Sequence, residues 1–317
     1  MKSLVLLLIL LSLISLVHVY YLMESSQTFL QTTQDGSKDL NEKLLEQIEK
    51  RIKDPKVLTP DEMREFFKSI VREYGEEAVL SAIETRLKDK EVYYIRHAQS
   101  TYNKWAALSA LNFAWTYENK VENYDPVLTE EGIQACNLQA ETLDKEHPFD
   151  ADLVLVSPLT RAMQTAKAIS RSKCFSNVKT LVATQLIRER TDCPGDIGKP
   201  KSVLEKTFPE IDFSYIAKES WWNYVEEDKI GRDRNGAEHY ARESEVDAKT
   251  RVAMTLLWIT MRPEKMVVMV SHSGFYRAIY NIGIFGKNKA KNNQCVKIGA
   301  DTISSNIREQ FKQIFSV

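Results

Sequence analysis

Few cysteines and no excess of charge of either sign limit what this chain of 317 residues can be. Its 43 lysines and arginines are balanced by 44 aspartates and glutamates, which excludes a generally basic nucleic-acid coat and an acidic disordered tail. Because 43% of the residues are hydrophobic, the chain can bury a core, and wholesale disorder is excluded as well. The length allows one large domain or two small ones of roughly 100–200 residues each. We therefore expect a globular protein without a nucleic-acid partner.

The four cysteines are too few for a disulfide scaffold, although they could form up to two disulfides in an oxidising compartment. None of them belongs to a C-x-x-C pair, so the sequence gives no support to a zinc site. A G-x-S-x-G elbow is missing too, which disfavours a serine hydrolase.

The one long hydrophobic run lies at the N-terminus. Residues 4–17 are almost wholly aliphatic, and as a helix residues 4–23 would span about 30 Å, the thickness of a hydrocarbon core. No small-residue cleavage site follows, so residues 1–23 are interpreted as an uncleaved signal anchor, with a cleaved signal peptide as the main alternative. Lys2 on the N-terminal side then puts the bulk of the chain on the lumenal or extracellular face, or outside the cell after cleavage. No N-x-S/T sequon gives this secretory route independent support.

Residues 24–90 are predicted to be a polar linker followed by a charged helical spacer. Asp54-Pro55 breaks a first helical pattern, and Thr59 begins a second helix as its N-cap. That helix should end at Tyr74, and another should cover residues 76–88. Packing or spacing is the expected role, and the catalytic part of the chain is expected to be residues 91–317.

Three short apolar runs predict the strands of a buried sheet. They cover residues 91–95, 153–156 and 266–270 and alternate with helical segments. Continuous apolar runs joined by helices are typical of a parallel sheet that is covered on both faces. Further strands are expected near residues 178–183 and 295–299. The fold class is therefore α/β, a three-layer αβα sandwich with a mainly parallel central sheet.

Basic side chains follow all three of these strands. Arg96 and His97 follow the first, Arg161 comes five residues after the second, and His272 comes two residues after the third. Ligands of such sheets bind outside the carboxyl ends of the strands, so these four side chains should meet at one edge.

The helix after the second strand points to the nature of the ligand. Ser157 is predicted to cap this helix with Pro158 at its first position, which puts Arg161 in its early part. A cation at the N-terminus of a helix is unfavourable by up to ~1 kcal/mol, because it meets the positive end of the helix dipole. An anion that binds both the free N–H groups and the guanidinium would make the arrangement favourable. A structural carboxylate partner for Arg161 is the alternative. Convergence with three other basic side chains favours a phosphate.

Four motifs, in order, resemble those of the histidine phosphatase superfamily, also called the phosphoglycerate-mutase-like family. They are Arg96-His97-Ala98-Gln99-Ser100-Thr101-Tyr102-Asn103, Leu128-Thr129-Glu130-Glu131-Gly132-Ile133-Gln134-Ala135, Ser157-Pro158-Leu159-Thr160-Arg161-Ala162-Met163-Gln164-Thr165-Ala166 and Val270-Ser271-His272-Ser273-Gly274. The resemblance covers residues 91–285. Phe208–Ser214 and Arg242–Ser244 are similar to the mutase-like phosphatase branch of plants and fungi. Ala98-Gln99 replaces the Gly-Glu of the glycolytic mutases.

The resemblance implies a role for each motif residue. His97 would be the nucleophile that takes the phosphoryl group, and Glu189 the acid that protonates the leaving oxygen and then activates water. The phosphate oxygens would be held by Arg96, Asn103, Arg161 and His272. His272 also counts as catalytic, and neither a metal nor a cofactor is expected. Pairing with a flanking arginine is the structural alternative for Glu189.

The expected function is metal-independent hydrolysis of a phosphomonoester through a phosphohistidine, with a phosphorylated small molecule or a phosphoprotein as substrate. A phosphoglycerate mutase-type phosphotransferase is one alternative, and a catalytically silent, membrane-tethered binding domain is another. The insertion at residues 200–245 is the expected determinant of substrate choice.

Overall fold

A computed structural model describes Lys43, Glu46 and residues 60–109, 117–118, 120–146, 149–216, 218–223, 242–282 and 290–315. The chain forms two units, Met1–Ile48 and Glu49–Val317, and almost everything described belongs to the second. The proposed anchor, the polar linker and the Thr59 cap lie outside the described residues. No helix in the described ranges is long and apolar enough to cross a membrane.

The second unit contains a six-stranded sheet in the order β4-β3-β2-β5-β1-β6. The strands are β1 (Glu91–Arg96), β2 (Leu153–Val156), β3 (Leu181–Ala183), β4 (Ile211–Asp212), β5 (Met266–Ser271) and β6 (Cys295–Ile298). All neighbouring pairs are parallel except β1 and β6, which are antiparallel. The prediction of an α/β fold with a mainly parallel sheet is therefore confirmed. In β1, β2 and β5 every residue is buried except the half-buried Glu91, Tyr93 and Met266, as expected for strands that are covered on both faces.

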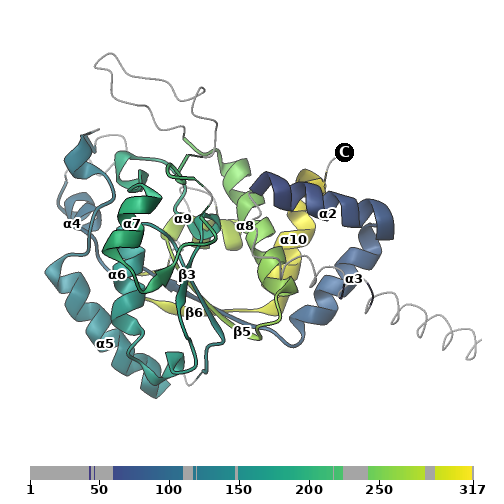
Figure 1. Cartoon of the computed structure of the whole chain (residues 1–317), viewed down its shortest axis with the longest axis horizontal. Coiled ribbons are helices and arrows are strands. Elements are labelled where there is room, and N and C mark those ends of the chain that lie inside the picture. The colour runs from purple at the N-terminus through teal and green to yellow at the C-terminus, as the bar shows by residue number, and fades with distance from the viewer. Residues whose placement is uncertain are drawn as a thin grey trace, which may run out of the picture. The chain divides into compact units, whose positions relative to one another are not determined.

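Helices lie on both sides of the sheet (Figure 1). They are α2 (Pro60–Tyr74), α3 (Glu76–Leu87), α4 (Thr101–Leu108), α5 (Glu130–Glu146), α6 (Thr160–Ile169), α7 (Lys201–Thr207), α8 (Glu245–Met261), α9 (Ser273–Ile279) and α10 (Ala300–Phe315), with short 3-10 turns η2 (Val121–Asn123), η3 (Lys173–Phe175), η4 (Gln185–Ile187) and η5 (Pro194–Asp196). One apolar cluster joins alternate residues of the central strands, including Val154, Val156, Val268 and Val270, to α5 and α6. This period of two follows from the pleat of the strands.

The predicted spacer helices belong to the globular unit. The helix end at Tyr74 is confirmed, and Gly75 separates α2 from α3 with a φ of 83°, a conformation that favours glycine. Both helices contact α8 and α10, and α3 buries Val79 and Ile83. On the surface Arg308 of α10 donates to Glu84 of α3.

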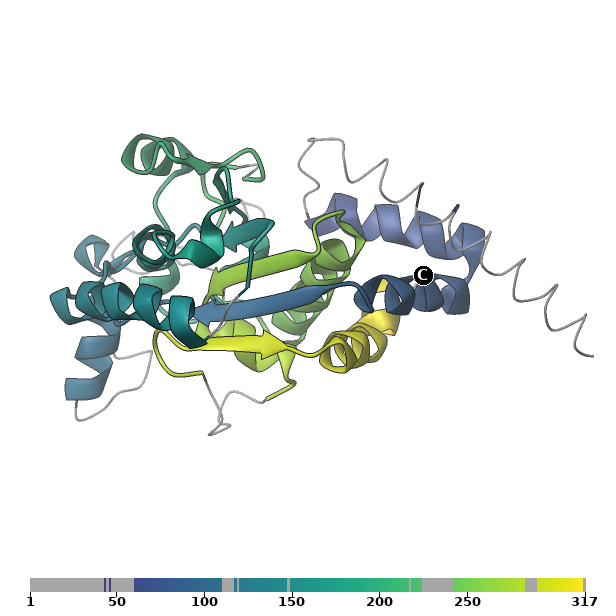
Figure 2. The same cartoon turned by 90° about the horizontal axis from the view of Figure 1, so that it is seen from below.

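The strand order decides where the site forms. Strand β5 lies between β1 and β2, and the three run parallel (Figure 2 shows β5 beside β1, with β6 on the other side of β1). Past the strand ends, the His97 amide donates to the Ser271 carbonyl (2.9 Å) and the Ser157 amide to the Val270 carbonyl (3.0 Å). The residues that follow the three strands therefore lie together at one edge of the sheet.

Candidate active site

The carboxyl ends of β1, β2 and β5 open into a cavity of about 340 Å³. Five of the six predicted site residues line it, namely Arg96, His97, Asn103, Arg161 and Glu189. The sixth, His272, is fully buried beside His97, with 4.9 Å between the ring centroids. The convergence expected from the sequence is thus present in the structure.

His97 is held in one tautomer by its own loop. Its Nδ1 lies 2.7 Å from the Ala98 carbonyl oxygen, which can only accept, so Nδ1 carries the hydrogen. Nε2 is left with a free lone pair. Burial lowers the pKa of His97 well below its usual value, and the nearby Arg161 and Arg96 guanidiniums lower it further. The imidazole is therefore neutral at neutral pH, as a nitrogen nucleophile must be.

His272 follows β5 and is the N-cap of α9. Its Nε2 lies 2.7 Å from the Ser157 hydroxyl, and its backbone carbonyl accepts from the Tyr94 hydroxyl at 2.7 Å. Its Nδ1 is buried and has no hydrogen-bond partner in the described part of the chain. Burial, with Arg161 and His97 nearby, lowers the pKa of His272 well below its usual value. The ring is thus fixed at one nitrogen and unsatisfied at the other, and it lies behind His97 and does not line the cavity.

The prediction that Ser157 caps the helix after β2 was wrong. Helix α6 begins at Thr160 with Leu159 as N-cap, so Ser157 and Pro158 lie before it. The buried Asp125 carboxylate provides the cap from 35 residues away, because it accepts from the Thr160 amide (2.7 Å) and from the Thr160 hydroxyl. Ser157 is therefore free to orient His272. Arg161 lies in the first turn, as predicted.

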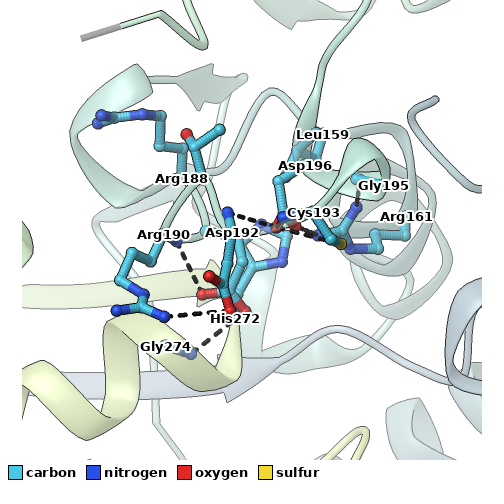
Figure 3. A network of polar contacts seen from close by, with 12 residues as sticks. Leu159, Arg161, Arg188, Arg190, Asp192, Cys193, Gly195, Asp196, His272 and Gly274 are labelled. Carbon is cyan, nitrogen blue, oxygen red and sulfur yellow. Dashed lines mark hydrogen bonds and ion pairs between the residues drawn. The ribbon is translucent and has the colours of Figure 1, made fainter. Parts of the chain in front are cut away.

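The two arginines that were predicted to bind phosphate are buried and held by backbone carbonyls. Arg96 donates from Nη1 to the Ala290 carbonyl (2.9 Å), and its Nε has no partner in the described ranges. Arg161 donates from Nη1 to the Gly195 carbonyl (2.8 Å) and from Nη2 to the Asp196 carboxylate (3.0 Å) (Figure 3). The carboxylate partner that the sequence left open for Arg161 therefore exists. Arg161 nevertheless lines the cavity as well.

Asn103 presents its amide nitrogen as a donor. Ser100 caps α4, and the Asn103 Oδ1 accepts from the Ser100 amide (3.1 Å) in a reciprocal capping box. The same Oδ1 accepts from Nδ2 of Asn292 (3.1 Å), which also donates to the His97 carbonyl (3.0 Å). Because the oxygen is occupied by donors, the NH2 group of Asn103 is the part that remains for a cavity ligand.

Glu189 is oriented by the amino end of α9. Its carboxylate accepts from the Arg190 amide (2.9 Å), the Gly274 amide (3.2 Å) and the Ser273 hydroxyl (3.4 Å). The flanking arginine side chains pair with other acids, Arg190 with Asp192 at 3.1 Å and Arg188 with Glu243 at 3.0 Å. The structural alternative for Glu189 therefore loses support.

A buried ion network holds the segment that carries Glu189. Arg251 of α8 binds the Glu243 carboxylate through two nitrogens (2.8 and 2.7 Å) and donates to the Leu186 and Arg188 carbonyls (2.8 and 3.2 Å). Burial alone would raise the pKa of Glu243, but Arg188 and Arg251 overcome it and lower that pKa to about 2. The carboxylate is therefore charged and fixes the turn before Glu189.

Sequence reasoning missed three residues that shape this site. Asp196 pairs with Arg161, Asn292 braces His97 and Asn103, and Gly274 leaves room for Glu189, because a Cβ at Gly274 would lie 2.0 Å from the Glu189 Oε1. Only Gly274 carried a local signal, since it belongs to a motif. The predicted insertion at residues 200–245 contributes no cavity-lining residue within its described positions, 200–216, 218–223 and 242–244, whereas Glu245, the last residue of the range, does line the cavity.

Residues 92–191 match the histidine phosphatase superfamily (branch 1). A Schizosaccharomyces pombe protein named "Probable phosphatase" is 29% identical over 163 residues, which are 49% of this chain and 69% of that protein. An Arabidopsis thaliana "Phosphoglycerate mutase-like protein" is 27% identical over 225 residues, 63% of this chain and 76% of the relative. The solved structure of a mycobacterial glucosyl-3-phosphoglycerate phosphatase aligns with 66% of this chain and 92% of that protein's chain. The sequence identity is 18% and the TM-score is 0.37. The fungal and plant relatives agree with the branch that the motifs indicated. Residues 92–191 therefore belong to the histidine phosphatase superfamily, branch 1, and the class of activity that these matches support is that of a phosphatase.

Proposed function

We propose that the protein hydrolyses phosphomonoesters through a covalent phosphohistidine at His97, without a metal ion. The observation that carries this proposal is the tautomer of His97, whose Nδ1–H is bound to the Ala98 carbonyl so that Nε2 is an unprotonated nucleophile at the cavity. Phosphoryl transfer needs little more than such a nucleophile, correct positioning and compensation of charge.

In the first step the Nε2 lone pair attacks phosphorus while the bond to the ester oxygen breaks. The protonated Glu189 carboxyl gives its proton to the leaving oxygen, so that an alcohol departs and a carboxylate remains. Glu189 lines the same cavity as His97 and is held by two backbone amides. Splitting the displacement in this way replaces one difficult reaction by two easier ones.

In the second step a water molecule gives a proton to the Glu189 carboxylate and attacks phosphorus as the N–P bond breaks. Orthophosphate leaves, Nε2 regains its lone pair, and Glu189 is protonated again. Both the nucleophile and the acid therefore return to their starting states.

Charge on the phosphoryl oxygens is compensated by the clamp. Arg96 and Arg161 supply two buried guanidiniums, and Asn103 supplies an amide NH2. The unpartnered Nδ1 of His272 and Nε of Arg96 are the groups that a phosphate oxygen would satisfy. Removal of one such donor typically lowers kcat by roughly 100- to 1,000-fold.

Trapping of the intermediate tests the proposal. The full chain is mixed with 4-nitrophenyl phosphate, quenched in alkali within milliseconds, digested and analysed by mass spectrometry for an acid-labile phosphoryl group on His97. His97→Ala should form no adduct and release no orthophosphate. A burst of product without any adduct at His97 would overturn the mechanism.

Product analysis separates hydrolysis from transfer. Orthophosphate released in equal amount to the alcohol means a phosphatase, whereas an isomerised monoester means a mutase, in which the phosphohistidine returns its group to the substrate. No product together with phosphate binding would indicate a binding domain. A screen of phosphorylated metabolites and phosphopeptides against the full chain would identify the natural substrate class.

We also propose that residues 4–23 anchor the protein in a membrane of the secretory pathway, with residues 91–317 on the lumenal or extracellular side. The aliphatic sequence supports the anchor, and Lys2 on its N-terminal side supports the orientation. Release of full-length protein into the supernatant on carbonate extraction would contradict the anchor.

A further inference from the structure

Asp196 is a buried carboxylate next to the proposed phosphate clamp, and the mechanism above does not use it. It ends the turn η5 and lines the cavity with only 7% of its surface exposed. Its Oδ1 accepts from the Arg161 Nη2 at 3.0 Å. Its Oδ2 accepts from the Asp192 and Cys193 amides at 3.1 and 3.2 Å. One side chain therefore joins a clamp arginine to the loop that begins at Glu189 (Figure 3).

We propose that Asp196 is a positioning residue that fixes the Arg161 guanidinium in the orientation that binds the phosphoryl group. This inference rests on the proposed function, because it requires Arg161 to hold phosphate.

The geometry of Arg161 gives the reason. Two consecutive residues, Gly195 and Asp196, accept from its two terminal nitrogens and so hold the plane of the guanidinium. A guanidinium has five N–H groups in a rigid fork, so three of them remain for a ligand once these two are occupied. Arg161 lines the cavity. The Gly195 and Asp196 oxygens therefore determine the direction in which the remaining N–H groups of Arg161 point.

The site requires a carboxylate and not an amide. Both oxygens of Asp196 face donors, since Oδ1 meets the guanidinium and Oδ2 meets two backbone amides. In Asp196→Asn the NH2 group would point at donors in either orientation of the amide, and one set of bonds would be lost. Burial raises the pKa of Asp196, although Arg161 opposes this rise. The three N–H groups that donate to its two oxygens are the partners that a carboxylate accepts from.

The Asp196 carboxylate also holds the loop of residues 189–196, which lies between Glu189 and the partner of Arg161. Glu189 lies at one end of residues 189–196 and Asp196 at the other, and the Oδ2 contacts fix the turn between them. The ion pair with Arg161 then fastens this loop to α6. The positions of the acid and of one phosphate ligand are thus coupled through a single residue.

The test measures the competitive Ki of orthophosphate and the kcat/KM for 4-nitrophenyl phosphate in the full chain. Asp196→Asn should raise the Ki and lower kcat/KM by roughly 10- to 100-fold, less than the loss expected when Arg161 itself is removed. In the Arg161→Gln background, Asp196→Asn should change the Ki of orthophosphate by less than about threefold, because the arginine through which Asp196 affects phosphate binding is gone. Fully additive losses would overturn the proposal.

The matched control is Glu210→Gln, which removes a carboxylate paired with Lys167 of the same helix α6, at 2.6 Å and outside the cavity. It should leave the Ki unchanged. A merely structural Asp196 would lower the melting temperature and the active fraction in Asp196→Asn but not the Ki of the enzyme that stays folded, and this result would refute positioning.

Two further outcomes are distinguishable. If Asp196→Asn does not fold, Asp196→Glu keeps the charge but moves the oxygens by a methylene, and it should raise the Ki as well; an unchanged Ki there overturns the proposal. If the unmodified protein releases no orthophosphate from any substrate in the screen, the proposed function fails. Activity with a normal Ki in the Asp196 variants overturns only the role of Asp196.

Discussion

Replacement of Gly274 by alanine should disable the acid while leaving the fold intact. A Cβ at position 274 would lie 2.0 Å from the Glu189 Oε1, whereas ordinary contacts begin at 3.4 Å, so the carboxylate must move by at least 1.4 Å. That movement breaks the 3.2 Å bond from the Gly274 amide and displaces the proton donor from the leaving oxygen. A misplacement of about 1 Å can cost roughly 100-fold, and general acid catalysis as a whole contributes roughly 100- to 10,000-fold. We expect kcat/KM for an alkyl phosphate to fall about 100-fold.

The assay compares an alkyl phosphate with 4-nitrophenyl phosphate, whose leaving group needs little protonation. Gly274→Ala and Glu189→Gln should both lose far more activity on the alkyl ester than on the aryl ester. Gly299→Ala is the matched control, because its Cβ would meet nothing closer than the Thr302 hydroxyl at 3.9 Å. The melting temperature of Gly274→Ala should not fall, since alanine favours a helix over glycine. Equal losses on both esters would refute the acid role of Glu189 and the reasoning from this contact.

Three other outcomes follow from the site. The pKa of Glu243 is lowered from 4.5 to about 2, worth about 3 kcal/mol, so Glu243→Gln should lower the melting temperature at pH 7 by roughly 6–12 °C. The variant should also lose about 3 kcal/mol less stability than the unmodified protein as pH falls from 4.5 towards 2, and identical acid unfolding curves would contradict the network. Ser157→Ala should lower kcat/KM about tenfold on alkyl and aryl esters alike, because it frees the His272 ring, and a loss confined to alkyl esters would speak against this role. Because protonation of His97 stops attack and its pKa lies well below 6.5, the kcat/KM profile should have no acidic limb at 6.5, and a limb there would contradict the buried neutral imidazole.

The parts of the fold that the sequence predicted are those with strong local patterns. The three buried strands were continuous apolar runs, and Gly75 marked a helix boundary by its conformational freedom. Strand β4 was missed because its two residues, Ile211 and Asp212, are too short for any periodicity. The antiparallel direction of β6 depends on its pairing with β1, which no local pattern encodes.

In the candidate site, too, the sequence predicted the residues of local motifs and missed those that act from distant parts of the chain. Residues within motifs could be named from the sequence, and the strand order then explains why they meet. The N-terminal cap of α6 was mispredicted because Asp125, which is distant in the chain, competes with the local serine and wins. Asp196 and Asn292 act across 35 and 195 residues respectively, so their roles become visible only once the chain is folded.

The position of residues 290–294 near the end of the chain has a consequence for the order in which the site assembles during translation. It supplies the acceptor for Arg96 and the amide that ties His97 to Asn103, yet it is translated after all four motifs. A nascent chain halted at residue 280 would carry all six predicted site residues and lack the brace that Asn292 provides between His97 and Asn103. The brace on the loop of His97 can therefore form only after residues 290–294 have been synthesised.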